Sequence, residues 1–92
     1  MKIDLDPAKN EKNIRERGLS FEQVGDFDFA NAVVRQDVRK SYAEPRFVAL
    51  GMLDARLHVL CFSLAARGIR VISFRKANRR EEKVHEQAPP HD

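Results

Sequence analysis

The sequence predicts an α+β domain, in which two N-terminal helices and a C-terminal helix pack on a mainly antiparallel sheet. Three observations lead to this prediction. Signals that start and stop helices crowd the first part of the chain. Three strongly apolar runs of strand length follow, separated by short turns, and a new helix start follows the last of them. With 92 residues, one core is expected, so the sequence predicts a single domain over residues 1–88 and a flexible, proline-bearing tail over residues 89–92.

The first residues predict a strand and then a helix. Residues 2–6 alternate apolar and charged side chains, which is typical of a short, half-buried strand near the edge of a sheet. Asp6 can accept hydrogen bonds from the free amides of a first helical turn, and Pro7 fits the first helical position. Gly18 supplies the left-handed residue that ends such a helix. The first helix is therefore expected between Pro7 and Gly18.

A second helix is expected directly after the first. Ser20 and Gln23 have the spacing of a capping box, in which each side chain bonds to the backbone of the other residue. Phe21, Val24 and Phe27 would then form the apolar face of this helix.

The rest of the chain predicts four strands and a last helix. Three of the strands form an antiparallel meander, with turns at residues 54–55 and 65–68. Their runs are apolar on both alternating faces, so partial cover is expected on both sides of the sheet, with the helices on one side. Asn78, with Glu81 three residues later, caps the last helix, which should end before Pro89. The four expected strands are residues 32–37, 46–53, 56–64 and 69–74.

Composition excludes several classes of protein. Hydrophobic residues make up 42% of the chain and charged residues 34%, but no apolar run approaches the length of a membrane span, and the N-terminus does not resemble a signal peptide. A cytoplasmic protein without a membrane contact is expected. The lone Cys61 cannot form an internal disulfide and is expected as a small buried side chain. No two of His58, Cys61, His85 and His91 have the spacing of a metal pair, so neither a metal nor another cofactor is expected.

Positive charge concentrates in one segment, residues 67–80. The chain as a whole has a formal net charge of +3, whereas this segment has six cations and no carboxylate, so the remainder carries −3. Such local charge is expected of a site for a polyanion. The same run is equally consistent with a solvated surface whose arginines pair with Glu81, Glu82 and Glu86. The six cations are Arg67, Arg70, Arg75, Lys76, Arg79 and Arg80.

Two side chains are candidate proton carriers. His85 follows the last cap by about two turns and can exchange a proton near neutral pH, although a surface histidine without a role is the simpler interpretation. Lys9 lies in the first turn of the first expected helix, where the helix dipole disfavours a cation, and this hints at a purpose other than helix stability.

Three motifs follow one another along the chain. They consist of Asp6, Pro7, Lys9, Asn10, Asn13, Arg15, Gly18, Ser20, Phe21 and Glu22, then Glu44, Arg46, Phe47 and Gly51, then Arg70, Ile72, Ser73, Arg75, Ala77, Arg79, Arg80 and Glu81. Together these motifs resemble the BrnT family, the toxins of BrnT–BrnA type II toxin–antitoxin systems. The resemblance covers nearly the whole chain up to about His85. It departs from the family pattern at Arg17, where His is frequent, and at His85, where Tyr is frequent.

The resemblance implies a RelE-like fold and an endoribonuclease that arrests translation. It also implies a BrnA-type antitoxin that inactivates the toxin and makes the DNA contact of the complex. Cleavage without a metal needs a base, an acid and cations for the phosphate. The expected phosphate binders and transition-state stabilisers are Arg70, Arg75, Arg79 and Arg80, the expected proton carriers are Lys9 and His85, and the further RNA contacts are Arg67, Lys76 and Arg46. A non-catalytic nucleic-acid-binding module, or an interaction domain for an acidic protein, would use the same cations.

Overall fold

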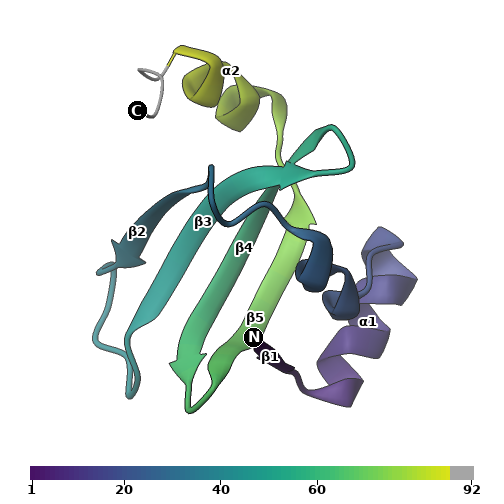
Figure 1. Ribbon diagram of the computed structural model, residues 1–92, viewed down its shortest axis with the longest axis vertical. Helices are drawn as coiled ribbons and strands as arrows, with labels where there is room; N and C mark the ends of the chain where they lie inside the picture. The colour runs from purple at the N-terminus through teal and green to yellow at the C-terminus, as the bar shows by residue number, and fades with distance from the viewer. Residues whose placement is uncertain (88–92) are drawn as a thin grey trace.

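The computed structural model describes residues 1–87 and contains one five-stranded sheet flanked by helices (Figure 1). The strand order is β1-β5-β4-β3-β2, in which β1 runs parallel to β5 and every other pair is antiparallel. The predicted meander is thus confirmed, while the predicted tail lies outside the described residues. The elements are β1 (Lys2–Asp4), α1 (Pro7–Arg17), the 3₁₀ helix η1 (Phe21–Asp26), β2 (Val33–Asp37), β3 (Arg46–Leu53), β4 (Arg56–Ala65), β5 (Gly68–Lys76) and α2 (Arg79–Gln87).

Local signals set the ends of α1 as the sequence predicts. The Asp6 carboxylate accepts a hydrogen bond of 2.9 Å from the Ala8 amide at the start of the helix. Gly18 has φ 64°, and its N–H donates to the Ile14 carbonyl at 2.8 Å at the end. These bonds depend on neighbours in sequence, which is why a pattern of residues suffices to place them.

The predicted second helix is wrong as an α-helix: the structure has one N-terminal α-helix and the six-residue η1 in its place. The capping box is present, with Ser20 accepting from the Glu22 amide and the Gln23 side chain accepting from the Ser20 amide. The apolar residues Phe21, Val24 and Phe27 recur every third position, which lines one face of a helix with three residues per turn. All three are buried in the core.

One face of the sheet carries the main core. Figure 1 shows α1 and η1 beside β5 and β1, and the apolar residues of η1 pack on Ala49, Leu60, Val71 and Phe74 of the strands. Asn13 of α1 is buried in this layer, where its amide group donates to the Leu19 and Phe74 carbonyls at 2.8 and 2.9 Å. It therefore fastens the helix to β5 through two backbone acceptors.

The other face is only partly covered, in agreement with the predicted partial cover: Leu57 and Val59 are buried with Ala77 in a small second cluster, and the rest of this open face is exposed. The helix α2 does not lie across the sheet but stands at one end of it, at the top of Figure 1. It is joined to the strands by ion pairs from Glu81 to Arg75 of β5 and from Glu82 to Arg56 at the start of β4. Apolar strand residues are exposed to a groove for that reason, and the half-buried Cys61 lies among them rather than in the core.

The first strand, β1, lies at the edge of the sheet, where it pairs with β5. Lys2 aligns with Gly68 and Asp4 with Arg70. The two backbones approach so closely that a Cβ added at Gly68 would collide with the Lys2 backbone. Only glycine fits there.

Candidate nucleic-acid interface

A row of polar side chains crosses the open face at the end opposite α2. The strand register aligns Asp37 of β2 with Arg46 of β3, Arg46 with Ser63 of β4, Ser63 with Arg70 of β5, and Arg70 with Asp4 of β1. Residues that are aligned on neighbouring strands project to the same face. Two arginines are thereby placed on either side of a small hydroxyl residue, each next to one edge carboxylate.

This row borders a hollow of about 210 Å³, which we call the Lys9 pocket. Lys9 reaches it from the first turn of α1, and Glu44 comes from the loop that leads into β3. Lys9 and Arg46 form no ion pair with any carboxylate among residues 1–87, so their positive charges are uncompensated. The pocket is lined by Lys9, Tyr42, Ala43, Glu44, Arg46, Ser63, Arg70 and Ile72.

Arg70 is the most strongly compensated cation of the pocket. Its guanidinium donates from Nε and Nη2 to one Asp4 oxygen at 3.1 and 2.9 Å. These bonds raise the pKa of Arg70, and the nearby Glu44 carboxylate adds to this effect. Both partners of the Arg70–Asp4 pair are exposed, so the pair contributes little stability and can exchange for a phosphate.

A buried carboxylate anchors the loop that borders the pocket. Only 3% of the Asp37 side chain is exposed, and it accepts hydrogen bonds from Arg39 Nε and Nη2 at 2.9 and 2.8 Å and from the Tyr42 hydroxyl at 3.0 Å. The bonds from Arg39 hold the pKa of Asp37 well below its usual range. On the other side, the Arg46 guanidinium lies over the Tyr42 ring, 4.3 Å from its centroid.

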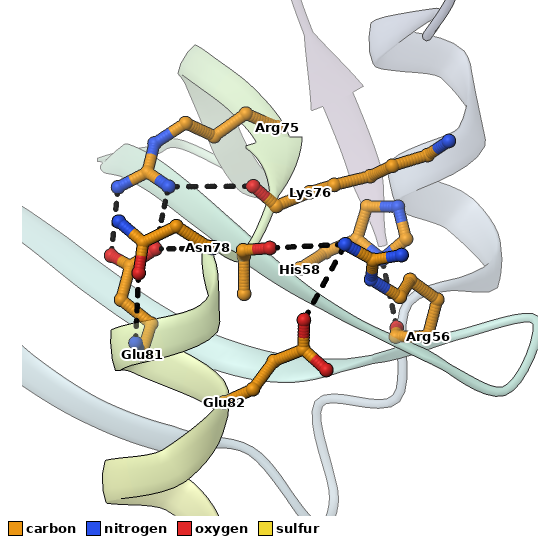
Figure 2. A network of polar contacts seen from close by, with 8 residues as sticks. Arg56, His58, Arg75, Lys76, Asn78, Glu81 and Glu82 are labelled. Atoms are coloured by element: carbon orange, nitrogen blue, oxygen red, sulfur yellow. Dashed lines mark hydrogen bonds and ion pairs between the residues drawn. The ribbon is translucent and has the colours of Figure 1, made fainter.

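At the opposite end of the open face, Arg75 is engaged by Glu81 (Figure 2). The two guanidinium nitrogens Nη1 and Nη2 donate to the two carboxylate oxygens at 2.7 and 2.8 Å. Glu81 also accepts from the Asn78 amide, while Asn78 Oδ1 accepts from the Glu81 amide, which completes the predicted cap of α2. The bonds from Arg75 lower the pKa of Glu81 to about 2, so this carboxylate is ionised at neutral pH.

His85 lies close to this end of the face. It lines a hollow of about 300 Å³ with Val33, Arg35, Leu50 and other residues, so α2 directs it toward the sheet. Between the two ends runs a groove of about 770 Å³, which has an apolar floor that includes Val48 and Val59 and a rim of arginines. Burial raises the pKa of the Cys61 thiol on this floor.

Comparison with known families identifies the chain. The sequence model of the ribonuclease toxin BrnT, of type II toxin–antitoxin systems, matches residues 5–81. The chain belongs to the BrnT family. Membership of this family indicates a ribonuclease toxin with RNA as its target and an antitoxin as its partner. Comparison with the curated proteins gave no match. Within residues 1–87, no helix is both long and apolar enough to cross a membrane.

The three motifs that carry the BrnT resemblance meet at the Lys9 pocket. Lys9 comes from the first motif, Glu44 and Arg46 from the second, and Arg70 from the third. Other residues of the same motifs have structural contacts. Asn10 Oδ1 accepts a hydrogen bond of 2.8 Å from the Phe21 backbone amide, and Asn13 joins α1 to β5.

The structure divides the predicted site residues into two groups rather than gathering them at one point. Lys9, Arg46 and Arg70 line the Lys9 pocket, whereas Arg75, Arg80 and His85 lie at the α2 end. Three predicted cations lie apart from both hollows. They are Arg67 in the β4–β5 turn, the exposed Lys76 at the end of β5, and Arg79, which lies on the outer side of α2.

Glu44 and Tyr42 line the pocket but were not among the predicted site residues. Glu44 is one of the residues that carry the BrnT resemblance, and its position two residues before Arg46 is the signal that could have marked it. Tyr42 is the only tyrosine of the chain and had no motif around it. His58 lies apart from the pocket: it is buried, its Nδ1 bonds to the Arg56 carbonyl at 2.8 Å, and its ring packs against Phe74.

Proposed function

We propose that this BrnT-family chain is a metal-independent endoribonuclease of the cytoplasm, and that it cleaves RNA in the Lys9 pocket. One observation supports this site above the others: three segments distant in sequence each send a charged side chain into the same hollow of about 210 Å³. Two of its cations, Lys9 and Arg46, have no carboxylate partner among residues 1–87. A phosphate would supply the missing negative charge.

The pocket contains each kind of group that metal-free RNA cleavage requires. Glu44 accepts the proton of the 2′-hydroxyl, whose oxygen attacks the adjacent phosphorus. Arg46 and Arg70 bind the phosphate oxygens and stabilise the charge that grows on them, since a guanidinium donates hydrogen bonds but does not exchange protons. The Lys9 ammonium gives a proton to the departing 5′-oxygen. The bond between phosphorus and that oxygen breaks, leaving a 2′,3′-cyclic phosphate and a 5′-hydroxyl.

The remaining cations extend the RNA path along the groove. Arg75 and Arg70 lie in rows four residues apart along β4, at Val59 and Ser63, which corresponds to about 13 Å. Arg75 therefore binds a phosphate beyond the cleaved one, and it must exchange Glu81 for that phosphate. Arg80 continues the path past this end of the groove, whereas Arg79 lies outside it. His85 lies at the same far end and takes no part in these proton transfers.

The test is cleavage of a structured RNA by the purified protein in EDTA. We expect fragments with 2′,3′-cyclic or 3′-phosphate ends. Glu44→Gln and Lys9→Gln should each lower kcat by about 10²- to 10⁴-fold, because each removes a proton carrier. The matched controls are Glu22→Gln and Lys12→Gln, which make the same changes at exposed positions outside the pocket, and His85→Ala. All three should cleave at nearly the normal rate.

Two results would overturn this assignment. Loss of activity in EDTA that a divalent ion restores would show a metal-dependent reaction. Normal cleavage by Glu44→Gln together with a loss in His85→Ala would move the chemistry to the α2 end. A protein that shifts RNA without cutting it is the non-catalytic binding module, and one that fails to shift RNA is a protein-interaction domain.

We propose further that the antitoxin is of the BrnA type and that it inhibits by covering the open face. The groove joins an apolar floor to a rim of arginines, which is the composition of a stable interface core with charged anchors around it. An acidic partner would also be captured quickly. A stoichiometric complex that still cuts RNA at the free rate would exclude inhibition by covering this face. DNA contact through the antitoxin is part of the same proposal.

A further inference from the structure

Tyr42 separates two hollows at the edge of the open face. One is the Lys9 pocket, and the other has a volume of about 410 Å³ inside the loop between β2 and β3. Arg46 lines the first hollow but not the second, so the guanidinium over the ring lies on the side of the Lys9 pocket. The rest of the ring borders the loop hollow, where Lys40 Nζ lies over the ring at 5.6 Å from its centroid. This second hollow is lined by Gln36, Asp37, Val38, Lys40, Ser41, Tyr42 and Pro45.

The ring of Tyr42 is held in place from two sides. Its hydroxyl donates to Asp37, and the same carboxylate is fixed by two bonds from Arg39. Arg46 holds the ring face at 4.3 Å. Tyr42 is partly exposed, so water could bond to its hydroxyl, and the hydroxyl does not need a buried carboxylate as its hydrogen-bond partner. The contacts instead fix the direction of the ring before any ligand arrives, which lowers the cost of binding one.

Charge and shape together define the ligand that fits. The Lys9 pocket offers Lys9, Arg46 and Arg70 to an anion. The loop hollow directly beside it offers the Tyr42 ring, and a stacked base would displace the exposed Lys40 side chain, whose Nζ lies 5.6 Å from the ring centroid. Unpaired RNA bases are bound in this way, by stacking on an aromatic ring while cations bind the phosphate. The separation of the two hollows by one ring matches a single nucleotide, with its phosphate on one side and its base on the other.

We propose that Tyr42 is a base-stacking residue, and that the loop hollow binds the unpaired nucleobase adjacent to the phosphate in the Lys9 pocket. The inference rests on the proposed cleavage site for the identity of that phosphate. It goes beyond it by making the base next to the cleaved bond a determinant of where the RNA is cut. A paired base remains stacked in its helix, so single-stranded segments are the substrates.

The chain offers a direct probe, because Tyr42 is the only tyrosine and there is no tryptophan. The binding measurement uses a short single-stranded oligonucleotide with 2′-O-methyl groups, which lacks the 2′-hydroxyl and is not cut. Binding should quench the tyrosine fluorescence, because the base stacks on the ring. An abasic site at one position of the oligonucleotide should abolish the quenching, and the same site at the other positions should not.

Variants separate stacking from structure. Tyr42→Leu should weaken binding by about 5- to 150-fold, the range found when a stacking residue is removed. In this variant the abasic oligonucleotide should bind as well as the complete one. Tyr42→Phe keeps the ring and loses only the bond to Asp37, so it should retain most of the affinity. Thermal unfolding of each variant establishes that it is folded.

The outcomes distinguish this inference from the proposed nuclease. The stacking role would be overturned if Tyr42→Leu bound and cut RNA as the wild type does, and if an abasic site weakened binding equally in both proteins. This result would leave the proposed nuclease intact. Position-specific quenching by an RNA that the protein never cuts would support the subsite and reject the cleavage site. A loss in Tyr42→Phe as large as in Tyr42→Leu, with both variants folded, would show that the bond to Asp37 matters rather than the ring, and would also overturn the inference.

Discussion

Replacing Asn13 with alanine tests whether this side chain fastens α1 to the sheet. The side-chain amide uses both of its N–H donors, at 2.8 Å to the Leu19 carbonyl and at 2.9 Å to the Phe74 carbonyl. Each lost bond removes about 1 kcal/mol net, and a buried acceptor left without a donor costs about 1 to 3 kcal/mol. Because a carbonyl has a second lone pair for other donors, the low end of this range applies, and we expect a loss of about 2 to 3 kcal/mol in the free energy of unfolding.

The measurement is thermal and urea unfolding of Asn13→Ala beside two comparison variants. For a domain of this size, a loss of 2 to 3 kcal/mol corresponds to a fall in Tm of about 10 °C or more. Asn10→Ala is the matched control, because Asn10 lies on the same helix but accepts one bond, from the Phe21 amide, and should cost about 1 kcal/mol. Asn13→Asp should be less stable than Asn13→Ala at pH 7, since a carboxylate facing two carbonyls has no donor. A Tm for Asn13→Ala within about 2 °C of the wild type would refute the reasoning.

Two further expectations concern the β3–β4 turn and the α2 contact. Ala55 has φ 62°, a left-handed conformation that costs a residue with a Cβ about 1 kcal/mol. Ala55→Gly should therefore raise the free energy of unfolding by about 0.5 to 1 kcal/mol, and a lower Tm would contradict this. The pKa of Glu81 is lowered to about 2 in the folded protein, so the stabilisation from its pair with Arg75 is complete above its unfolded pKa and is lost as the pH falls toward 2. The wild type should therefore unfold at a higher Tm than Glu81→Gln at pH 6 and at nearly the same Tm at pH 2, and a difference that persists at pH 2 would contradict the role of the ion pair.

Local chemistry explains which parts of the fold could be predicted from the sequence. The caps at Asp6, Gly18 and Ser20 depend on neighbours within a few residues, and each is present. The period of three in η1 is present in the sequence as well, but the capping box does not distinguish a 3₁₀ helix from an α-helix. The parallel pairing of β1 with β5 joins distant residues and has no local signal.

The site was predicted in composition but not in arrangement. The arginine-rich segment did indicate a cationic face, yet which cations share a pocket depends on the strand register, which aligns Arg46 with Ser63 and Ser63 with Arg70. Lys9 and His85 were expected to act together because both can carry a proton. The end of the open face that each one reaches is set by how α1 and α2 attach to the sheet, and no residue pattern contains that information. Arg75 bonds to Glu81, which agrees with the alternative prediction that the arginines of this segment pair with nearby glutamates.

The parallel pairing of β1 with β5 also determines when the pocket can exist during synthesis. Asp4 and Arg70 are separated by 66 positions along the chain, and α1, which carries Lys9, begins directly after β1. During translation the N-terminal segment emerges first, but its partner strand is among the last parts to be made. A nascent or prematurely terminated chain that ends before β5 lacks Arg70 and the strand to which Asn13 is bonded. Such a chain has no complete pocket, so with the proposed cleavage site it cannot cut RNA before β5 has been made.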